Sequence, residues 1–209
     1  MYKSHIYEHD EIKKLTEISW DENIDLKRLE ISFDHLCNLS CTYCNSEFSS
    51  TWGNDIKKNG GYDNMKTSGG HTYREAYKFD TDPVKEENIY IKKFFEWWDS
   101  GLKDSLEELR ITGGEPSRSP HFWKFVENCD DEKFIFSVNS NLQMDELRIK
   151  KLIDCSHNFR HFELFTSGES HGKFGEFVRH GLEYDTWLTN IRKFANEGKY
   201  VNIHNMMTI

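Results

Sequence analysis

Three cysteines within eight residues, Cys37, Cys41 and Cys44, are the part of the sequence best suited to chemistry. They directly follow residues 26–33, whose alternating apolar and polar side chains are typical of a strand. Thiolates at this spacing can hold one metal centre from a single loop, and iron–sulfur clusters are bound by cysteines in such runs. With three protein ligands, one iron of a [4Fe–4S] cluster stays open to a small molecule, as the fourth position does in catalytic zinc sites.

A structural zinc site is the alternative use of the same thiols. One histidine, His35 or His71, could complete a Cys3His ligand set. Zinc sites usually pair two short cysteine motifs, whereas the remaining cysteines, Cys129 and Cys155, are isolated and far along the chain. Disulfides are disfavoured because neighbouring cysteines on a tight loop rarely meet the required geometry. The spacing favours a cluster, and a non-catalytic zinc-binding interaction module remains the alternative.

Length and composition restrict the class of protein. The 209 residues suffice for one sizeable core, and no linker divides them. Charged residues make up 30% and hydrophobic ones 36%, with a mean hydropathy of −0.78, and no apolar run approaches a membrane span or signal peptide. A net charge of −9 disfavours nucleic acid as a partner. Cysteines gathered in one loop fit a reducing compartment, so we expect a cytoplasmic protein.

The order of elements predicts an α/β fold. The expected strands are 26–33, 106–112, 134–139, 160–166 and 200–209, and the expected helices are 84–100, one starting at 119–120, 144–155 and 185–196. Strands that alternate with helices predict parallel pairing, with the functional site at the carboxyl ends of the strands. Residues 1–26 form an N-terminal extension, and residues 45–82 are expected to be a long irregular insertion with glycine turns.

The cysteine run resembles the signature of the radical S-adenosylmethionine (SAM) superfamily, in which an aromatic residue, here Tyr43, precedes the third cysteine. Residues 110–116, Arg-Ile-Thr-Gly-Gly-Glu-Pro, look like the family's GGE motif at the end of its second strand. Residues 163–170 and 177–182 resemble the branch with twitch domains, which is well represented in phage genomes. The resemblance implies a partial (β/α)6 barrel with about five β/α units. Residues 1–209 would then be a single core without the rest of the barrel and a twitch or SPASM-type domain.

The resemblance also implies a set of binding residues. Cys37, Cys41 and Cys44 would hold a [4Fe–4S] cluster with SAM at its open iron. The implied SAM-binding residues are Tyr43, Gly113, Gly114, Glu115, Asn139, Ser167 and Arg179. In the family, the segment that matches the glycine pair and the following glutamate holds the amino group of the SAM methionine, and the position of Arg179 lies near the SAM carboxylate.

Two stretches depart from the family's pattern. Residues 139–141 read Asn-Ser-Asn where the family often carries Thr-Asn-Gly. Residues 165–168 read Phe-Thr-Ser-Gly where many relatives show Ser-x-Asp-Gly. The second departure leaves the ribose contact open among Glu163, Ser167 and Glu169.

The function implied by the resemblance is reductive cleavage of SAM. A reduced cluster would supply one electron, and the products would be methionine and a 5′-deoxyadenosyl radical that abstracts hydrogen from a peptide or small-molecule substrate. The implied partners are SAM, this substrate and an electron donor such as flavodoxin or ferredoxin. The implied location is the cytoplasm of a prokaryote or of a phage-infected host cell. A truncated core without activity is a further alternative.

Overall fold

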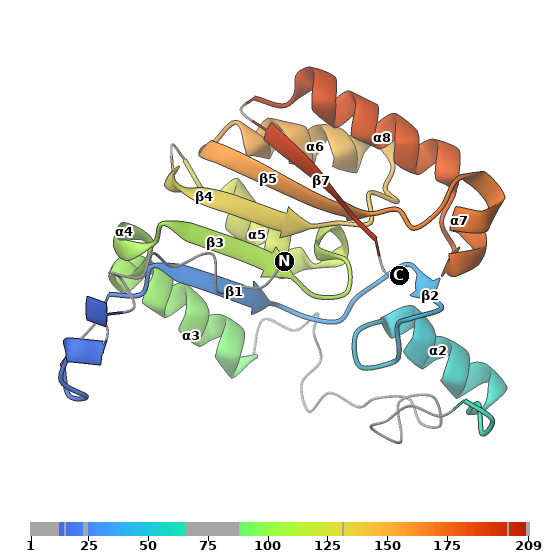
Figure 1. Ribbon diagram of the computed structural model, residues 1–209, viewed down its shortest axis with the longest axis horizontal. Coiled ribbons are helices and arrows are strands. Elements are labelled where there is room, and N and C mark those ends of the chain that lie inside the picture. The colour runs from blue at the N-terminus through green and yellow to red at the C-terminus, as the bar shows by residue number, and fades with distance from the viewer. Residues whose placement is uncertain are drawn as a thin grey trace.

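The described part of the chain is built around one sheet of five parallel strands, in the spatial order β1-β3-β4-β5-β7 (Figure 1). The strands are β1 (Arg28–Ser32), β3 (Glu108–Thr112), β4 (Glu132–Asn139), β5 (Phe159–Ser167) and β7 (Val201–Met206). The structure is a computed structural model that describes residues 13–14, 16–22, 25–65, 88–130, 132–199 and 201–207. The predicted α/β class with parallel strands is confirmed.

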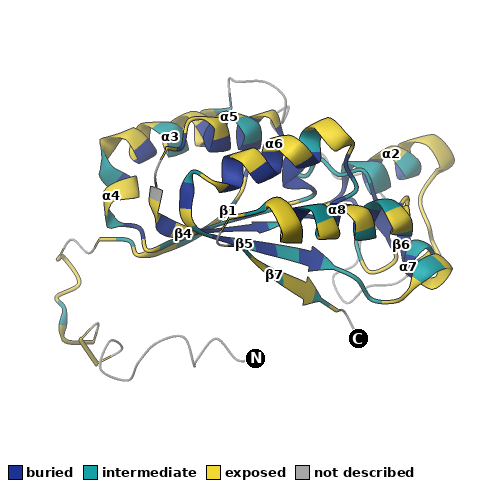
Figure 2. Cartoon of the chain, turned by 90° about the horizontal axis from the view of Figure 1, so that it is seen from above, coloured by how far each residue is buried: buried dark blue, intermediate teal, exposed yellow. Residues whose placement is uncertain are grey.

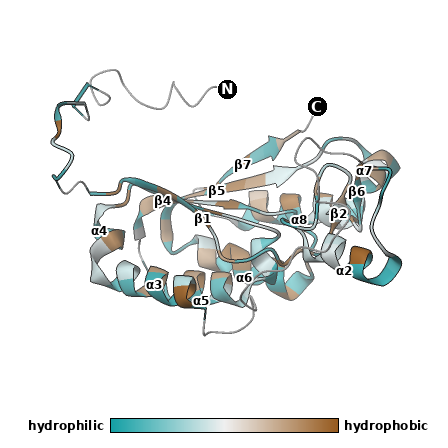
Figure 3. Cartoon of the chain, turned by 90° about the horizontal axis from the view of Figure 1, so that it is seen from below, coloured by the Kyte–Doolittle hydropathy of each residue, from teal (hydrophilic) through white to brown (hydrophobic). Residues whose placement is uncertain are grey.

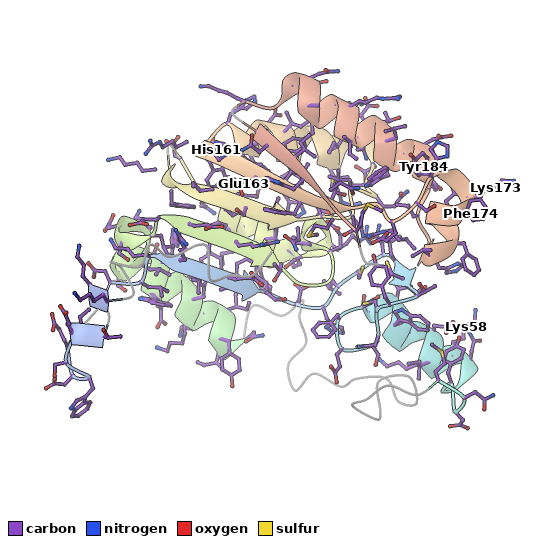
Figure 4. The ribbon with its side chains drawn as sticks, viewed as in Figure 1. Lys58, His161, Glu163, Lys173, Phe174 and Tyr184 are labelled. Atoms are coloured by element: carbon purple, nitrogen blue, oxygen red, sulfur yellow. The ribbon has the colours of Figure 1, made fainter. Side chains whose placement is uncertain are left out.

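Alternation along the strands gives the sheet one apolar face and one polar face. Leu109 and Ile111 of β3 are fully buried in the core. Arg110 lies between them and therefore projects to the opposite face, because successive side chains of a strand point in opposite directions. His161 and Glu163 of β5 lie on this polar face, which is turned toward the viewer in Figure 4.

The helices that connect successive strands are α3 (Ile89–Trp97), α5 (Pro120–Glu127), α6 (Glu146–Ser156) and α8 (Tyr184–Glu197). Figures 2 and 3 show them together on one side of the sheet. Helices on a single face are typical of a barrel-type sheet, because an open doubly wound sheet has helices on both faces. The other face is thus available to line the interior of a partial barrel.

Side-chain caps explain where two of these helices begin. Ser119 accepts a hydrogen bond of 3.4 Å from the backbone N–H of Phe122, and Pro120 occupies the first position of α5. Asp145 accepts a hydrogen bond of 2.9 Å from the N–H of Arg148 at the start of α6. Both helices therefore start close to the positions that the sequence predicts.

One helix lies where the sequence predicts irregular structure. Helix α2 (Ser50–Asn59) occupies part of the expected insertion 45–82, so the prediction of an irregular segment is wrong for these residues. The helix is capped by Ser49, and it ends at Gly60, whose φ is +89°. Only two of its ten residues are buried, which explains why its apolar periodicity is weak. Residues 66–82 of the insertion lie outside the described residues.

Several short elements were not predicted. They are β2 (Ser40–Cys41), β6 (Arg179–His180), α7 (Gly172–Val178), the π-helical turn η2 (Trp98–Leu102), α4 (Lys103–Ser105) and the 3-10 turn η3 (Pro116–Arg118). Strands β2 and β6 pair antiparallel in a separate two-stranded ladder. Gly101, which directly follows the predicted helix 84–100, has a φ of +126° inside η2, so the chain makes a wide turn there before α4.

Residues 1–12, 15, 23 and 24 of the predicted N-terminal extension 1–26 lie outside the described residues. The assignment of residues 1–209 to a single core without a further domain stays a prediction. Within the described residues, no helix is both long enough and apolar enough to cross a membrane.

Candidate functional site

The cysteine loop is anchored by the beginning of α2. The hydroxyl of Ser50 accepts a hydrogen bond of 3.0 Å from the N–H of Cys37 and donates one of 3.1 Å to the Cys37 carbonyl. Thr51 donates to the same carbonyl at 2.7 Å, and Ser49 donates to the carbonyl of Leu39 at 2.6 Å. Three consecutive hydroxyl residues therefore fix the backbone around the first cysteine.

The second cysteine is fixed by the β2–β6 ladder. Cys41 pairs with Arg179, and Ser40 pairs with His180. The N–H of the next residue, Thr42, donates a hydrogen bond of 2.8 Å to the carbonyl of Val178. A segment almost 140 residues later in the sequence thus holds the loop in place, and it brings Arg179 next to the cysteines.

A cavity of about 200 Å³ lies between this loop and the carboxyl ends of the strands. It is lined by Cys37, Leu39, Cys41, Tyr43, Cys44, Phe48, Gly113, Gly114, Asn139, Ser140, Asn141, Ser167, Arg179 and Met206. Every predicted site residue except Glu115 is among them. The volume is below the roughly 300–1,000 Å³ of most ligand pockets, so a ligand larger than a compact inorganic group would extend beyond the described walls.

Burial suppresses ionisation of the thiols. It raises the pKa of Cys37 to about 12 and that of Cys44 to about 11, and it also raises the pKa of Cys41. The guanidinium of Arg179 opposes the effect of burial at Cys41. Because thiolates are the form that binds metals, metal binding here must displace protons from three sulfur atoms.

Two cavity-lining residues, Tyr43 and Arg179, belong to a polar network that also includes Glu169. The Tyr43 hydroxyl donates a hydrogen bond of 2.7 Å to Glu169 Oε1 and accepts one of 2.8 Å from Arg179 Nη1. Arg179 and Glu169 also form an ion pair at 3.6 Å, with side chains only 6% and 7% exposed. Burial, more than these partners, raises the pKa of Tyr43.

Two charged atoms of this network are buried without a hydrogen-bond partner in the described part of the chain. They are Nε of Arg179 and Oε2 of Glu169. Leaving such an atom unsatisfied costs about 1–3 kcal/mol, so a ligand that supplied partners of opposite charge would be stabilised there. Arg179 was predicted, whereas Glu169 was only one of three open choices for the ribose contact.

The glycine pair allows the segment after β3 to lie directly against the loop that leads to Cys37. A Cβ atom on Gly113 would come within 2.6 Å of Ser32 Oγ, and one on Gly114 within 2.4 Å of the Leu36 carbonyl oxygen. Gly113 also has a φ of +128°, which side chains disfavour. Close backbone packing therefore requires glycine at both positions. Both glycines also line the cavity, where they present backbone atoms.

Glu115 does not line the cavity. It is 1% exposed, and its carboxylate accepts hydrogen bonds from the N–H of Ser117 at 3.1 Å, the hydroxyl of Ser140 at 2.9 Å and the N–H of Asn141 at 2.6 Å. Burial raises its pKa, while these hydrogen bonds act in the opposite direction. Glu115 thus holds the end of β4 against the GGE segment, and its place beneath the cavity differs from the ligand contact that we predicted.

Asn139 and Ser167 end two neighbouring strands and both line the cavity. The side chain of Arg110 donates from Nε and Nη2 to Asn139 Oδ1, at 3.1 and 2.9 Å. Because the carbonyl oxygen of the amide is held by a donor, the NH2 group of Asn139 is the part left for a ligand.

The cavity residues that sequence reasoning missed are Leu39, Phe48, Ser140, Asn141 and Met206. Asn141 could have been predicted as a cavity residue, because it closely follows the predicted strand 134–139 and the site was expected at the carboxyl ends of the strands.

Within the described residues, no group of three or more histidine, cysteine, aspartate or glutamate side chains is arranged so that it could hold a metal ion. The zinc alternative with His35 therefore has no formed site there, and His71 lies outside the described residues. Around a single zinc ion, sulfur ligands at about 2.3 Å must lie close together. In a cluster each thiolate binds a different iron, so the sulfur atoms stand farther apart.

No protein-family model matches the chain, and no curated protein matches it in sequence. In fold, the chain is similar to SuiB of Streptococcus suis, a radical SAM enzyme. The structure of SuiB bound to S-adenosylmethionine gives a TM-score of 0.54 at 16% identity, over 93% of this chain and 36% of SuiB. The fold is consistent with a partial radical SAM barrel. SuiB bound to its precursor peptide SuiA gives the same TM-score and identity, over 93% of this chain and 35% of SuiB.

A third solved structure, native anSMEcpe with bound AdoMet and a peptide, matches at a TM-score of 0.48 and 18% identity, over 84% of this chain and 42% of that protein. The chain spans about a third of the length of SuiB. At such identities the likeness concerns the fold, so the chemistry of the site has to be argued from its own residues.

Proposed function

We propose that this chain is the catalytic core of a radical SAM enzyme, with a [4Fe–4S] cluster held by Cys37, Cys41 and Cys44 and SAM bound at the open iron. The observation that carries the proposal is convergence on one cavity. The three thiols share its walls with Gly113 and Gly114, and with residues at the ends of β4 and β5. A zinc ion that only stabilised the cysteine loop would not need residues from these strand ends.

The residues present fit an iron–sulfur cluster. Three thiols, one buried and two half-buried, line one cavity from a loop whose backbone is fixed by hydroxyl groups and by the β2–β6 ladder. Thiolate ligands bring negative charge into a place with little access to water, and the guanidinium of Arg179 beside Cys41 offsets part of it. When bound and reduced, the cluster would supply the electron that cleaves SAM to methionine and a 5′-deoxyadenosyl radical.

The charged groups beside the cavity suit the amino-acid part of SAM, which would extend beyond the described walls. That part carries an ammonium and a carboxylate. Arg179, in the cavity wall, has one buried donor, and its neighbour Glu169 has one buried acceptor, and both atoms lack partners in the described chain. Charge-assisted hydrogen bonds to such groups are about twice as strong as neutral ones. We assign Tyr43 the role of holding these two side chains in place, because its hydroxyl bonds to both.

The substrate proposed for the radical is a peptide, with a small molecule as the alternative. SuiB has been solved with a precursor peptide, and the polar face of the sheet would suit a substrate rich in hydrogen-bonding groups. An electron donor such as flavodoxin or ferredoxin, in the cytoplasm of a prokaryote or an infected cell, completes the proposal.

Anaerobic SAM cleavage tests the activity. The reconstituted protein, dithionite and SAM should give 5′-deoxyadenosine and methionine in equal amounts, as measured by mass spectrometry. Cys41→Ser should abolish this cleavage, whereas Cys155→Ser, which alters a buried cysteine outside the cavity, should preserve it. An intact cluster without any 5′-deoxyadenosine would identify an inactive core, and equal cleavage by the Cys41 variant would refute the ligand assignment.

A further inference from the structure

A second cavity, of about 280 Å³, lies behind the cysteine segment. It is lined by Ser40, Thr42, Trp52, Asp55, Tyr62, Met65 and His180. Cys41 and Tyr43 line the first cavity, while Ser40 and Thr42 line the second, so the two cavities lie on opposite sides of this segment. Helix α2 and strand β2, which supply much of the lining, lie next to each other in Figure 1.

Two aromatic rings and a carboxylate give this cavity its chemical character. The rings of Trp52 and Tyr62 meet edge to face, with centroids 5.9 Å apart and an angle of 85° between the planes. Asp55 Oδ2 accepts a hydrogen bond of 2.5 Å from the Tyr62 hydroxyl, and Oδ1 accepts one of 2.7 Å from the side chain of Asn59. These bonds fix the carboxylate beside the rings, and Met65 adds an apolar, polarisable surface.

Among the ion pairs of the described residues, none joins the Asp55 carboxylate to a lysine or arginine within 4.0 Å. Its two hydrogen-bond donors are neutral, so its negative charge is available to a ligand. Aromatic faces attract cations through their quadrupole, and a neighbouring carboxylate adds direct attraction. A neutral ligand would gain only the apolar contact.

We propose that this cavity binds a primary alkylammonium group, the group at the end of a lysine side chain. The alkyl stem would lie against Trp52 and Met65, and the ammonium would donate to Asp55. The occupant would lie beside the segment that carries Cys41, because Ser40 and Thr42 line the same cavity. Trp52 also contacts this segment, since its Nε1 donates a hydrogen bond of 2.9 Å to the Cys41 carbonyl. The proposal needs neither a cluster nor SAM, so it stands or falls separately from the proposed activity.

Binding can be measured with small probes of matched shape. The probes are n-butylammonium and 1-butanol, added to the 209-residue protein while the indole N–H signal of Trp52, assigned from the Trp52→Phe variant, is followed by NMR. The titration is made at about pH 8, where an unperturbed histidine side chain is uncharged. We expect a saturable shift with n-butylammonium and at least tenfold weaker binding of 1-butanol. Equal binding of both probes, or no saturation with either, would overturn the proposal.

Two substitutions test the assigned residues. Asp55→Asn keeps the shape and the acceptor for Tyr62 but removes the charge, and it should weaken n-butylammonium binding about fivefold. Tyr62→Leu keeps apolar volume and should also weaken it. Tyr90→Leu, at an exposed tyrosine of α3 outside the cavity, is the matched control and should leave binding unchanged. Unchanged affinity in the Asp55 variant would remove the carboxylate from the site.

Two further probes distinguish the possible sources of the ammonium group. Nα-acetyl-lysine N-methylamide presents it as a peptide does, and tetramethylammonium presents the charge without an N–H donor. If the occupant is a lysine side chain, the lysine derivative should bind at least as tightly as n-butylammonium. Tighter binding of tetramethylammonium would show that the cavity selects a quaternary ammonium compound, and the assignment to a primary amine would be wrong.

Discussion

Gly114→Ala is the substitution with the most direct structural consequence. The added Cβ would lie 2.4 Å from the carbonyl oxygen of Leu36 and 2.7 Å from the carbonyl carbon and oxygen of His35. All of these are backbone atoms, which cannot move aside as the end of a flexible side chain can. The loop toward Cys37 must therefore shift, and the hydrogen bond of 2.7 Å from Glu115 N–H to the Leu36 carbonyl is strained or lost.

The size of the effect follows from two contributions. Forcing an extra methyl group into a packed site costs about 1–3 kcal/mol. Loss of one backbone hydrogen bond adds about 1 kcal/mol. We therefore expect Gly114→Ala to lower the free energy of unfolding by about 2–4 kcal/mol.

Gly53→Ala is the matched control, because a Cβ on Gly53 meets nothing within 4 Å and the residue lies inside helix α2. Alanine is favoured over glycine in a helix interior, so this variant should gain about 0.5–1 kcal/mol. Both values are measured by urea denaturation of the cluster-free protein. A loss below about 1 kcal/mol for Gly114→Ala, or equal effects of the two variants, would refute the packing argument.

Three further predictions concern the groups around the cavity. Burial raises the pKa of Glu115, so the folded protein holds that proton more tightly than the unfolded chain and loses stability as pH rises through the folded-state pKa. Glu115→Gln should flatten this decline in denaturation midpoints measured across pH, and a slope like that of the wild type would contradict it. Arg179→Met leaves Glu169 buried without its ion pair and should cost about 3 kcal/mol in urea denaturation, with partial recovery when Glu169→Gln is added; no recovery would argue against the pairing. Ser50→Ala removes two hydrogen bonds to the backbone of Cys37 and should cost about 1–2 kcal/mol and lower the iron content after reconstitution. Unaltered stability and iron content would show that the loop is held by other contacts.

The sheet could be predicted because its signals are local. Three of its five strands, β1, β3 and β7, alternate apolar and polar residues, and β4 carries a short apolar run. Helical segments with clear starts lie between the strands, as with Ser119 before α5. Parallel pairing then brings the strand ends to one edge. For this reason Gly113, Asn139 and Ser167, which are far apart in the sequence, could be expected around one cavity.

Other features depend on contacts that no local pattern encodes. The β2–β6 ladder has only two residues in each strand, so its periodicity carries no signal, although it brings Arg179 to Cys41. Helix α2 has only two buried residues among its ten, so its apolar periodicity is weak. Glu115 was expected to face a ligand, but it is buried, and Ser140 and Asn141, which follow β4, donate hydrogen bonds to its carboxylate, which only the folded structure reveals.

Electron paramagnetic resonance of the anaerobically reconstituted, dithionite-reduced protein, with and without SAM, is the most direct test of the proposed site. The account predicts a reduced [4Fe–4S] signal that changes when SAM is added, because SAM would bind the iron that Cys37, Cys41 and Cys44 leave open. A signal that is indifferent to SAM, or a protein that takes up zinc in place of iron, would contradict it.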